Sequence, residues 1–339
     1  MKIKVIFHLV IDVILLVFDF LKWKFFRVQS ENGYRRLLSS FNLLGGSLNL
    51  MASKFLGRST MKFQNEGILG HLSEFQFDDA IKSLKRDGYF VFENALSTEF
   101  CDALLDESLK IKGFTRVMDT GGKVDYKLFD RHSPSSVRFD YKPGEILANK
   151  KFQEIIFDQS IANFAQAYLG NAPILDLIAM WWHTTFSSTP DKEAAQWFHF
   201  DMDRLKWIKF FFYLTDVDSE TGPHTFVPRT HRVFGIPIKL RRKGYTRLGD
   251  DEVSRYFPKS NWREFTGLRG TLIVEDTRGL HKGKHCISGD RLLFQLEFTS
   301  SMFGARIEDI EIVSGELSPV SREVMINNPY TYQAISLLD

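Results

Sequence analysis

Five apolar segments in the second half of the chain constrain its fold more than any other feature of the sequence. Each has the length and the aromatic or β-branched composition of a β-strand, and turn residues separate them. Helical patterns come before them, so the chain predicts an α+β fold around a β-sandwich or jelly roll. The strand segments are ILDLIAMWWHTTF (174–186), QWFHFDMD (196–203), WIKFFFYLTDV (207–217), GTLIVED (270–276) and RLLFQLEFTS (291–300). The earlier segments are helices at 77–88, 97–112 and 150–169, a strand at 89–96 and an irregular stretch at 114–149.

Composition and charge narrow the class of protein. Of the 339 residues, 44% are hydrophobic and 25% are charged, as in a globular protein with a sizeable core. A net charge of +2 argues against a protein that coats nucleic acid, and we expect no nucleic-acid partner. The 2 cysteines cannot build a disulfide framework or a cysteine zinc site. We therefore expect a reducing compartment, the cytoplasm, and any metal must be held by histidine and carboxylate side chains.

Residues 1–28 form an apolar segment with a narrow polar stripe. On a helix, His8, Asp12 and Asp19 share one face, because they are four and seven residues apart. Three interpretations stay open: a helix packed on this protein or on a second copy of it, a helix lying on a membrane surface, and a membrane-spanning helix. We expect residues 29–72 to be a linker with short helices and residues 73–339 to form the main domain.

The segment from Trp197 to Asp203 carries the most informative polar residues. Alternation along a strand places His199, Asp201 and Asp203 on one face, with phenylalanine and methionine side chains on the other. An imidazole and a carboxylate two residues apart supply two of the three ligands in the two-histidine, one-carboxylate site for Fe(II). Alone this pair is a weak signal, and a third ligand has to come from a later strand.

A third ligand and an anion-binding arginine follow further along the chain. His281 lies near the end of the strand segment 270–276, and Arg291 begins an apolar strand ten residues later. An arginine that faces an apolar interior is costly unless it meets an anion. A dicarboxylate co-substrate, held by the forked guanidinium, would be such an anion.

These residues resemble the signature of the phytanoyl-CoA dioxygenase-like family of Fe(II)- and 2-oxoglutarate-dependent oxygenases. His199-x-Asp201, the distant His281 and the later Arg291 are similar to the family's iron and 2-oxoglutarate motif. The resemblance extends over about residues 75–300 of the chain. One departure is the loop Pro228-Arg229-Thr230-His231, where the family has Pro-Gly-Ser-His. Two further stretches carry the likeness: DGYFVFENALS (87–97), which resembles the family's opening segment, and FFFYLTDVDSETGPHTFVPRTHR (210–232), which resembles its strand, acidic turn and loop.

The resemblance implies a double-stranded β-helix, the cupin-like jelly roll, flanked by helices and preceded by an apolar N-terminal helix. His199, Asp201 and His281 would be the catalytic metal ligands, and Arg291 would bind 2-oxoglutarate with Ser288 as a hydroxyl helper. The implied enzyme is a dioxygenase that uses Fe(II), 2-oxoglutarate and O2 to hydroxylate a small or lipid-like molecule, with release of succinate and CO2. Because related halogenases lack the carboxylate, Asp201 favours hydroxylation.

Two other functions stay open: a non-catalytic jelly-roll binding protein, and a scaffold anchored to a membrane surface through residues 1–28. His285 competes with His281 as a ligand, but the family's spacing to Arg291 favours His281. We expect His224 and His231 to have supporting or surface roles, and Asp203 to contact solvent or substrate at the strand end. A basic run forms either a solvated loop or a contact for a substrate phosphate or carboxylate: Lys239, Arg241, Arg242, Lys243 and Arg247.

Overall fold

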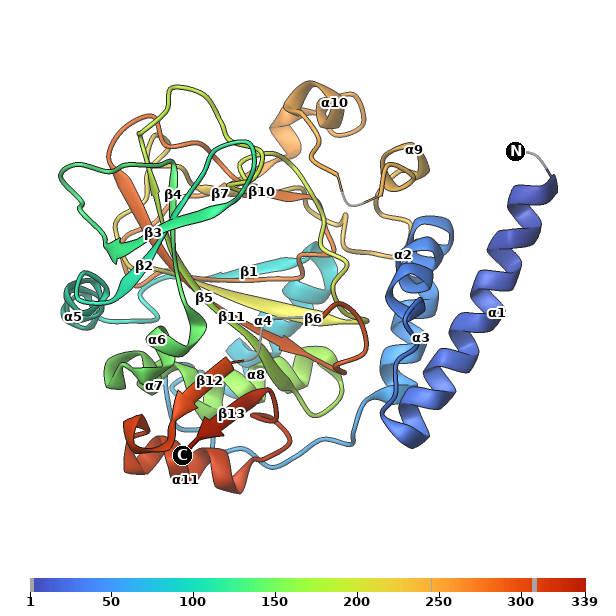
Figure 1. The fold of residues 1–339 in the computed structure, drawn as a ribbon, viewed down its shortest axis with the longest axis horizontal. Coiled ribbons are helices and arrows are strands. Elements are labelled where there is room, and N and C mark those ends of the chain that lie inside the picture. The colour runs from blue at the N-terminus through green and yellow to red at the C-terminus, as the bar shows by residue number, and fades with distance from the viewer. Residues whose placement is uncertain (1–2, 245, 307–309) are drawn as a thin grey trace.

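An eight-stranded antiparallel sheet lies at the centre of the molecule (Figure 1). The computed structural model describes residues 3–244, 246–306 and 310–339, so the first two residues of the predicted N-terminal helix lie outside the described part. The strand order is β1-β9-β6-β11-β5-β4-β2-β3, which places strands far apart in the sequence side by side. The strands are β1 (Tyr89–Phe92), β2 (Lys112–Arg116), β3 (Lys123–Leu128), β4 (Arg138–Tyr141), β5 (Ile174–Thr184), β6 (Trp207–Tyr213), β9 (Leu272–Glu275) and β11 (Asp290–Thr299).

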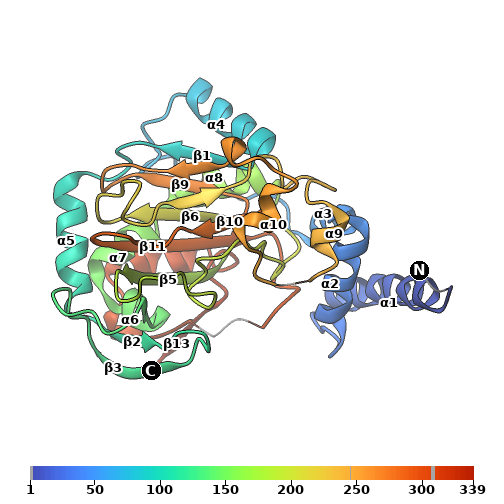
Figure 2. The ribbon, with the colours of Figure 1, turned by 90° about the horizontal axis from the view of Figure 1, so that it is seen from above.

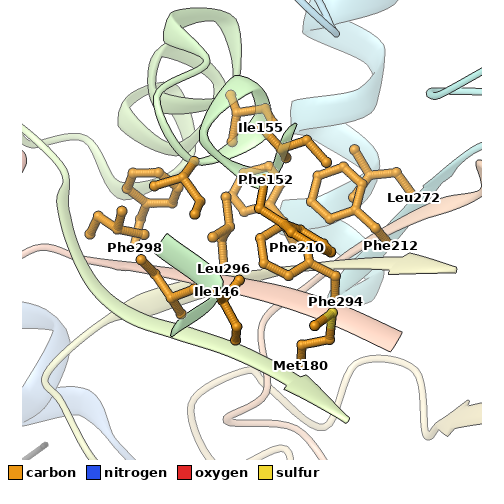
Figure 3. Packing of buried hydrophobic residues seen from close by; sticks show 14 of the residues in the cluster. Ile146, Phe152, Ile155, Met180, Phe210, Phe212, Leu272, Phe294, Leu296 and Phe298 are labelled. Atoms are coloured by element: carbon orange, nitrogen blue, oxygen red, sulfur yellow. The ribbon is translucent and has the colours of Figure 1, made fainter. Parts of the chain in front are cut away.

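Helices cover one face of this sheet through a large apolar layer. Figure 3 shows Phe152 and Ile155 of α7 packed against strand residues such as Phe210 and Phe294, all fully buried. Because alternate residues of a strand point to opposite faces, the neighbouring Lys209 on β6 points away from this layer. The helices of the main domain are α4 (Glu74–Asp87), α5 (Thr98–Ser108), α6 (Pro143–Ala148), α7 (Lys150–Ile156), α8 (Gln159–Leu169) and α11 (Pro319–Asn327).

A three-stranded sheet, in the order β10-β7-β8, packs on the other face of the large sheet. A second apolar cluster joins the two sheets, with Phe211 and Leu293 from the large one and Phe226 and Phe265 from the small one. The remaining elements are β7 (His224–Phe226), β8 (Arg263–Phe265), β10 (His281–Gly283), α9 (Ile238–Arg241), α10 (Asp250–Ser254), the 3-10 helices η1 (Lys259–Asn261) and η2 (Ser314–Glu316), and the parallel pair β12 (Ile310–Val313) and β13 (Ile335–Leu338).

Three N-terminal helices form an arm on one side of the molecule (Figures 1 and 2). They are α1 (Ile3–Phe26), α2 (Gly33–Leu44) and α3 (Ser47–Leu56), and α1 is the outermost. Phe41 of α2 stacks on Phe200 with ring centroids 5.8 Å apart, so α2 packs directly behind the segment that carries His199 and Asp201. Across the described ranges, no helix combines the length and apolar character needed to cross a membrane.

The α+β class and the large antiparallel sheet agree with the prediction, while the double-stranded β-helix in particular stays an expectation. Two local predictions were wrong. The stretch 114–149 is not irregular, since it contains β3, β4, α6 and most of β2. All residues of β3 are exposed, so the alternation of Val124, Tyr126 and Leu128 with charged residues marks no buried face, and the strand escaped prediction. The helix predicted over 97–112 ends at Ser108, because Lys112 and Gly113 pair with β3 instead.

The predicted strand 196–203 is not a regular strand either. Within this segment only two residues form β-bridges, Phe198 to Leu248 and His199 to His281. Because these partners come from different parts of the chain, no continuous strand forms. The alternation nevertheless holds. Phe198, Phe200 and Met202 are buried in an apolar cluster, while the intervening His199 and Asp201 line a cavity between the sheets.

Candidate metal centre

The backbone places the side chains of His199 and His281 next to each other. The two residues face one another across an antiparallel bridge, and each donates its backbone N–H to the other's carbonyl oxygen at 2.9 Å. Residues directly opposite in such a bridge project their side chains to the same side. The two imidazole rings therefore lie side by side, with centroids 4.2 Å apart.

Asp201 completes a group of three possible metal ligands. One ligand atom from each of His199, Asp201 and His281 lies within 4.8 Å of the other two, and all three side chains are buried. The Nε2 atoms of His199 and His281 are 3.9 and 3.6 Å from the carboxylate oxygens of Asp201. Two imidazoles and one carboxylate on one side of a cavity fit the facial triad that binds Fe(II) and leaves other coordination positions open.

Backbone carbonyls orient both imidazoles toward this group. Nδ1 of His199 lies 2.9 Å from the carbonyl oxygen of Trp197, and Nδ1 of His281 lies 3.0 Å from that of Gly279. In this arrangement Nδ1 carries the proton and donates to the carbonyl, so the lone pair of Nε2 faces the centre. Burial lowers the pKa of both histidines, which favours the neutral form that a metal needs.

Lys209 of β6 holds the carboxylate of Asp201. Its ammonium lies 2.7 Å from Oδ2 of Asp201 and 3.3 Å from Oε2 of Glu297. Burial alone would raise the pKa of Asp201, but Lys209 and the two imidazoles outweigh it, and the pKa is lowered. Asp201 is therefore an ionised carboxylate with one oxygen fixed by a lysine and the other facing His199.

Arg291 lies at the far side of the same cavity, which has a volume of about 290 Å³. Its side chain is 1% exposed, and its guanidinium contacts Nδ1 of His183 at 2.6 Å and the carbonyl oxygen of Gly222. The Nε atom of Arg291 is buried without a hydrogen-bond partner in the described structure. Because burial and Arg291 keep the pKa of His183 well below its usual value, His183 is neutral and leaves the charge of Arg291 uncompensated.

Two more arginines line the cavity and share a single acid. Arg116 and Arg138 each donate to a different oxygen of Asp140, at 2.7 and 2.8 Å, and Arg138 lies over the ring of Trp181 at 4.5 Å. Glu193 also lines the cavity, but Arg116, Arg138 and Arg291 together outnumber Asp140 and Glu193, so this wall keeps a positive charge. Such a wall favours an acidic group on a bound molecule.

Of the other histidines considered from the sequence, His285 and His231 lie outside the cavity, and His224 lines it without joining the ligand group. His285 contacts Oε1 of Gln196 at 3.2 Å, and His231 contacts the carbonyl oxygen of Lys85 at 3.2 Å. His224 lines the cavity and lies 2.9 Å from a carboxylate oxygen of Glu275, whose pKa burial raises to about 8. Both groups are therefore neutral near pH 7, because burial also lowers the pKa of His224, to about 3.

Ser288 is not brought to the cavity. Its hydroxyl donates to Glu220 at 3.2 Å on a partly exposed turn, because the residues after β10 bend away before β11 begins. Asp203, which was expected at a strand end, lines the cavity near Asp201. Of the five basic residues between Lys239 and Arg247 that were singled out in the sequence, only Arg247 lines the cavity.

Sequence reasoning missed several residues of the cavity. Lys209 could have been predicted, because it is a lone lysine inside the apolar run WIKFFFY. A buried lysine, like a buried arginine, needs an oppositely charged partner. The pattern around His183, at the end of β5, is a weaker indication of a cavity residue. Arg116 and Arg138 lie in the stretch that was expected to be irregular, where no local pattern marks them.

Comparison with known families places the chain in one of them. The model for phytanoyl-CoA dioxygenase (PhyH) matches residues 84–291, more than half of the chain, and the protein belongs to this family. The predicted resemblance is thereby confirmed. The matched range includes His199, Asp201 and His281, and it ends at Arg291. No curated protein sequence matches the chain.

Several solved structures are similar to this one. The non-haem α-ketoglutarate-dependent epimerase SnoN from nogalamycin biosynthesis has 16% identity and a TM-score of 0.49, with 67% of this chain and 84% of that chain covered. HygX from Streptomyces hygroscopicus, solved with nickel and 2-oxoglutarate, has 15% identity and a TM-score of 0.49, with 71% and 90% covered. EctD from S. alaskensis, in its apo form, has 16% identity and a TM-score of 0.47, with 75% and 83% covered.

Proposed function

We propose that the protein is an Fe(II)- and 2-oxoglutarate-dependent dioxygenase that hydroxylates a small organic molecule. The observation that carries this proposal is the buried group of His199, Asp201 and His281 in a cavity that also contains Arg291. Membership of the phytanoyl-CoA dioxygenase family supports the same cofactors. Bound Fe(II) with 2-oxoglutarate supplies O2 activation, and the cleavage of 2-oxoglutarate to succinate and CO2 accompanies oxidation of the substrate.

The residues of the chain fix the geometry of this chemistry. His199 and His281 present Nε2, and Asp201 presents the oxygen that Lys209 does not hold. Arg291 is suited to the far carboxylate of 2-oxoglutarate, because a buried guanidinium with an unpartnered Nε gains most from a charged acceptor. The side chains of His199, Asp201, His281 and Arg291 are all buried, which limits their contact with bulk water.

The size and charge of the cavity support a small or partly inserted substrate. A volume of about 290 Å³ is at the lower end of ligand sites and has to hold 2-oxoglutarate together with the reacting part of the substrate. A lipid-like molecule therefore fits only if it inserts one end. The positive wall formed by Arg116 and Arg138 favours substrates with a carboxylate or a phosphate.

The test measures succinate release and substrate oxidation together. Purified protein with Fe(II), 2-oxoglutarate and O2 is incubated with acidic, neutral and acyl-chain compounds, and products are examined by mass spectrometry. We expect one class of compound to raise succinate formation and to gain one oxygen atom. His199→Ala should abolish both signals, and Ser288→Ala, which changes an exposed turn, should leave them unchanged.

Two results would contradict this proposal. Binding of Fe(II) and 2-oxoglutarate with no succinate from any compound would favour a non-catalytic jelly-roll binding protein. Succinate formation accompanied by ring closure or epimerisation of the substrate would keep the cofactors but exclude hydroxylation.

A further inference from the structure

The N-terminal helix α1 is oriented with its polar stripe toward the protein. Asp19, 2% exposed, pairs with Arg36 of α2 at 2.7 Å, and Asp12 pairs with Arg35 of α2 at 3.3 Å. A surface helix usually turns its apolar side to the core and its charges to solvent. In α1 two ion pairs to α2 reverse this arrangement.

The inner side of α1 is firmly attached to the rest of the chain. Leu16 and Phe20 are buried in a cluster with α2, α3 and the main domain, and the ring of Phe20 lies 5.1 Å from that of Phe303. Just beyond the helix, Gln29 exchanges two hydrogen bonds with the backbone of Gly304, at 2.7 and 2.9 Å. The orientation of α1 is thus part of the fold, and its outer side is exposed on the surface of the chain.

The outer side of α1 is a continuous apolar surface. Phe18 is 57% exposed and Phe25 is 70% exposed, one directly above the other because they are seven residues apart. Helix α3 extends this surface with Met51 and Phe55, since Lys24 of α1 donates to the carbonyl oxygen of Phe55 at 2.7 Å. We call these residues the outer face: Val10, Ile11, Ile14, Leu15, Val17, Phe18, Leu21, Phe25, Phe26, Met51 and Phe55.

Positive charge surrounds and interrupts this outer face. Lys22 is exposed between Phe18 and Phe25 on the same side of α1, and Lys24 lies at the border with α3. The two acids within α1, Asp12 and Asp19, are already paired with arginines of α2. Further exposed basic residues around α1 and α3 are Arg27, Lys54 and Arg58.

We propose that the outer face binds the surface of a membrane that carries anionic lipids, with α1 lying flat in the headgroup region. Aromatic and aliphatic side chains enter the boundary of the acyl chains, while the lysines and arginines meet the lipid phosphates. A second copy of the chain fits the face less well, because a symmetric contact would bring the same unbalanced cations together. This function is independent of the proposed oxygenase reaction.

The test is binding of the full-length protein to vesicles of phosphatidylcholine with and without phosphatidylserine. We expect sedimentation with the anionic vesicles and at least about tenfold weaker binding for Phe18→Ser/Phe25→Ser. The matched control is Phe75→Ser/Val320→Ser, which removes two apolar side chains that are 81% and 71% exposed elsewhere and should bind as the wild type does. Lys22→Glu should reduce the preference for anionic vesicles about fivefold.

Three results would overturn the proposal. The first is wild-type protein that does not bind anionic vesicles. The second is Phe18→Ser/Phe25→Ser binding as tightly as the wild type. The third is Phe75→Ser/Val320→Ser losing as much affinity as Phe18→Ser/Phe25→Ser. Light scattering of lipid-free protein provides a separate criterion. A dimer that Phe18→Ser/Phe25→Ser converts to a monomer would show that a second copy covers the face. Because none of these variants alters the cavity, 2-oxoglutarate turnover reports on the oxygenase proposal separately.

Discussion

Lys209 shows how one buried side chain determines the form of a metal ligand. A lysine in the middle of a sheet is tolerated only with a charged partner, and Asp201 is that partner at 2.7 Å. The contact holds Oδ2, which also lies 3.6 Å from Nε2 of His281, and leaves Oδ1 toward His199. Asp201 is thereby prepared to bind a metal through a single oxygen.

Replacing Lys209 tests this orienting role. Lys209→Met removes the partner of Asp201 and should weaken Fe(II) binding by about 10- to 100-fold, as the loss of groups that orient metal ligands commonly does. Isothermal titration under argon measures the Kd. The control is Lys282→Met on β10, because Lys282 pairs with Asp250 outside the ligand group at 2.6 Å. Unchanged or tighter binding by Lys209→Met would show that the lysine opposes the metal instead of orienting its ligand.

At the residue scale, sequence reasoning found charged groups that stand out locally and missed those that depend on distant pairing. His199, Asp201 and Arg291 were found from their positions in predicted strand segments, and His281 from its spacing to Arg291 in the family's motif. The helper role predicted for Ser288 depended on the path of a turn, which residue spacing does not encode. The pairing of Arg116 with Asp140 joins two neighbouring strands, β2 and β4, from a stretch that was expected to be irregular.

At the scale of elements, the short strand β10 connects the metal ligands with Arg291. His281 and Gly283 lie on the same side of β10, because they are two residues apart. A Cβ atom on Gly283 would lie 3.0 Å from Nη2 of Arg291 and 3.4 Å from Cε1 of His183. The absence of a side chain at this position leaves room for the arginine.

Gly283→Ala should therefore disturb 2-oxoglutarate binding without disturbing the metal ligands. We expect the KM for 2-oxoglutarate to rise about tenfold, since the guanidinium must shift by a few tenths of an ångström, while the Kd for Fe(II) stays unchanged. Gly315→Ala is the control, because nothing lies within 4 Å of its added Cβ. An unchanged KM would mean that Arg291 does not hold the co-substrate.

Of the two ion pairs that hold the polar stripe of α1 against α2, the pair between Asp19 and Arg36 is the buried one. Arg36→Met leaves Asp19 buried without its partner and should lower the free energy of opening of α1 by about 3–5 kcal/mol. Hydrogen exchange of the amides of α1 measures this change. Arg35→Met is the control, because its side chain is 59% exposed and its pair with Asp12 contributes little. Equal protection of α1 in Arg36→Met and in the wild type would contradict the account.

The sequence indicated the polar stripe of α1 but not the direction in which it points. Periodicity locates Asp12 and Asp19 on one face, yet the partners Arg35 and Arg36 lie on another helix. The usual expectation of charges outward fails here, because two aspartates and two arginines meet between α1 and α2. Only tertiary structure shows that the apolar side faces solvent.

At the scale of the whole molecule, the cavity is built from both sheets and from the segment between β5 and β6. Binding of a metal should therefore stabilise the entire fold, since His281 lies 82 residues after His199 and 80 residues after Asp201 in the sequence. A metal at about one hundred times its Kd contributes about 2.7 kcal/mol to the free energy of unfolding. The expected result is a Tm several degrees higher with Fe(II) or Ni(II).

Two neighbouring histidines provide the matched pair for this measurement. His281→Ala should remove the metal-dependent rise in Tm, whereas His285→Ala, whose side chain contacts Gln196, should keep it. The same rise in both variants would mean that His281 is not a ligand. A rise lost only in His285→Ala would assign the site to the competing histidine.

The central claim is that His199, Asp201, His281 and Arg291 form one site for Fe(II) and 2-oxoglutarate. The most direct measurement is an anaerobic titration of the protein with Fe(II) and then 2-oxoglutarate, followed by visible absorption. A charge-transfer band should appear with the wild type, be absent from His199→Ala, and need a higher 2-oxoglutarate concentration in Arg291→Gln. A wild type without the band, or His199→Ala with the band undiminished, would contradict the claim.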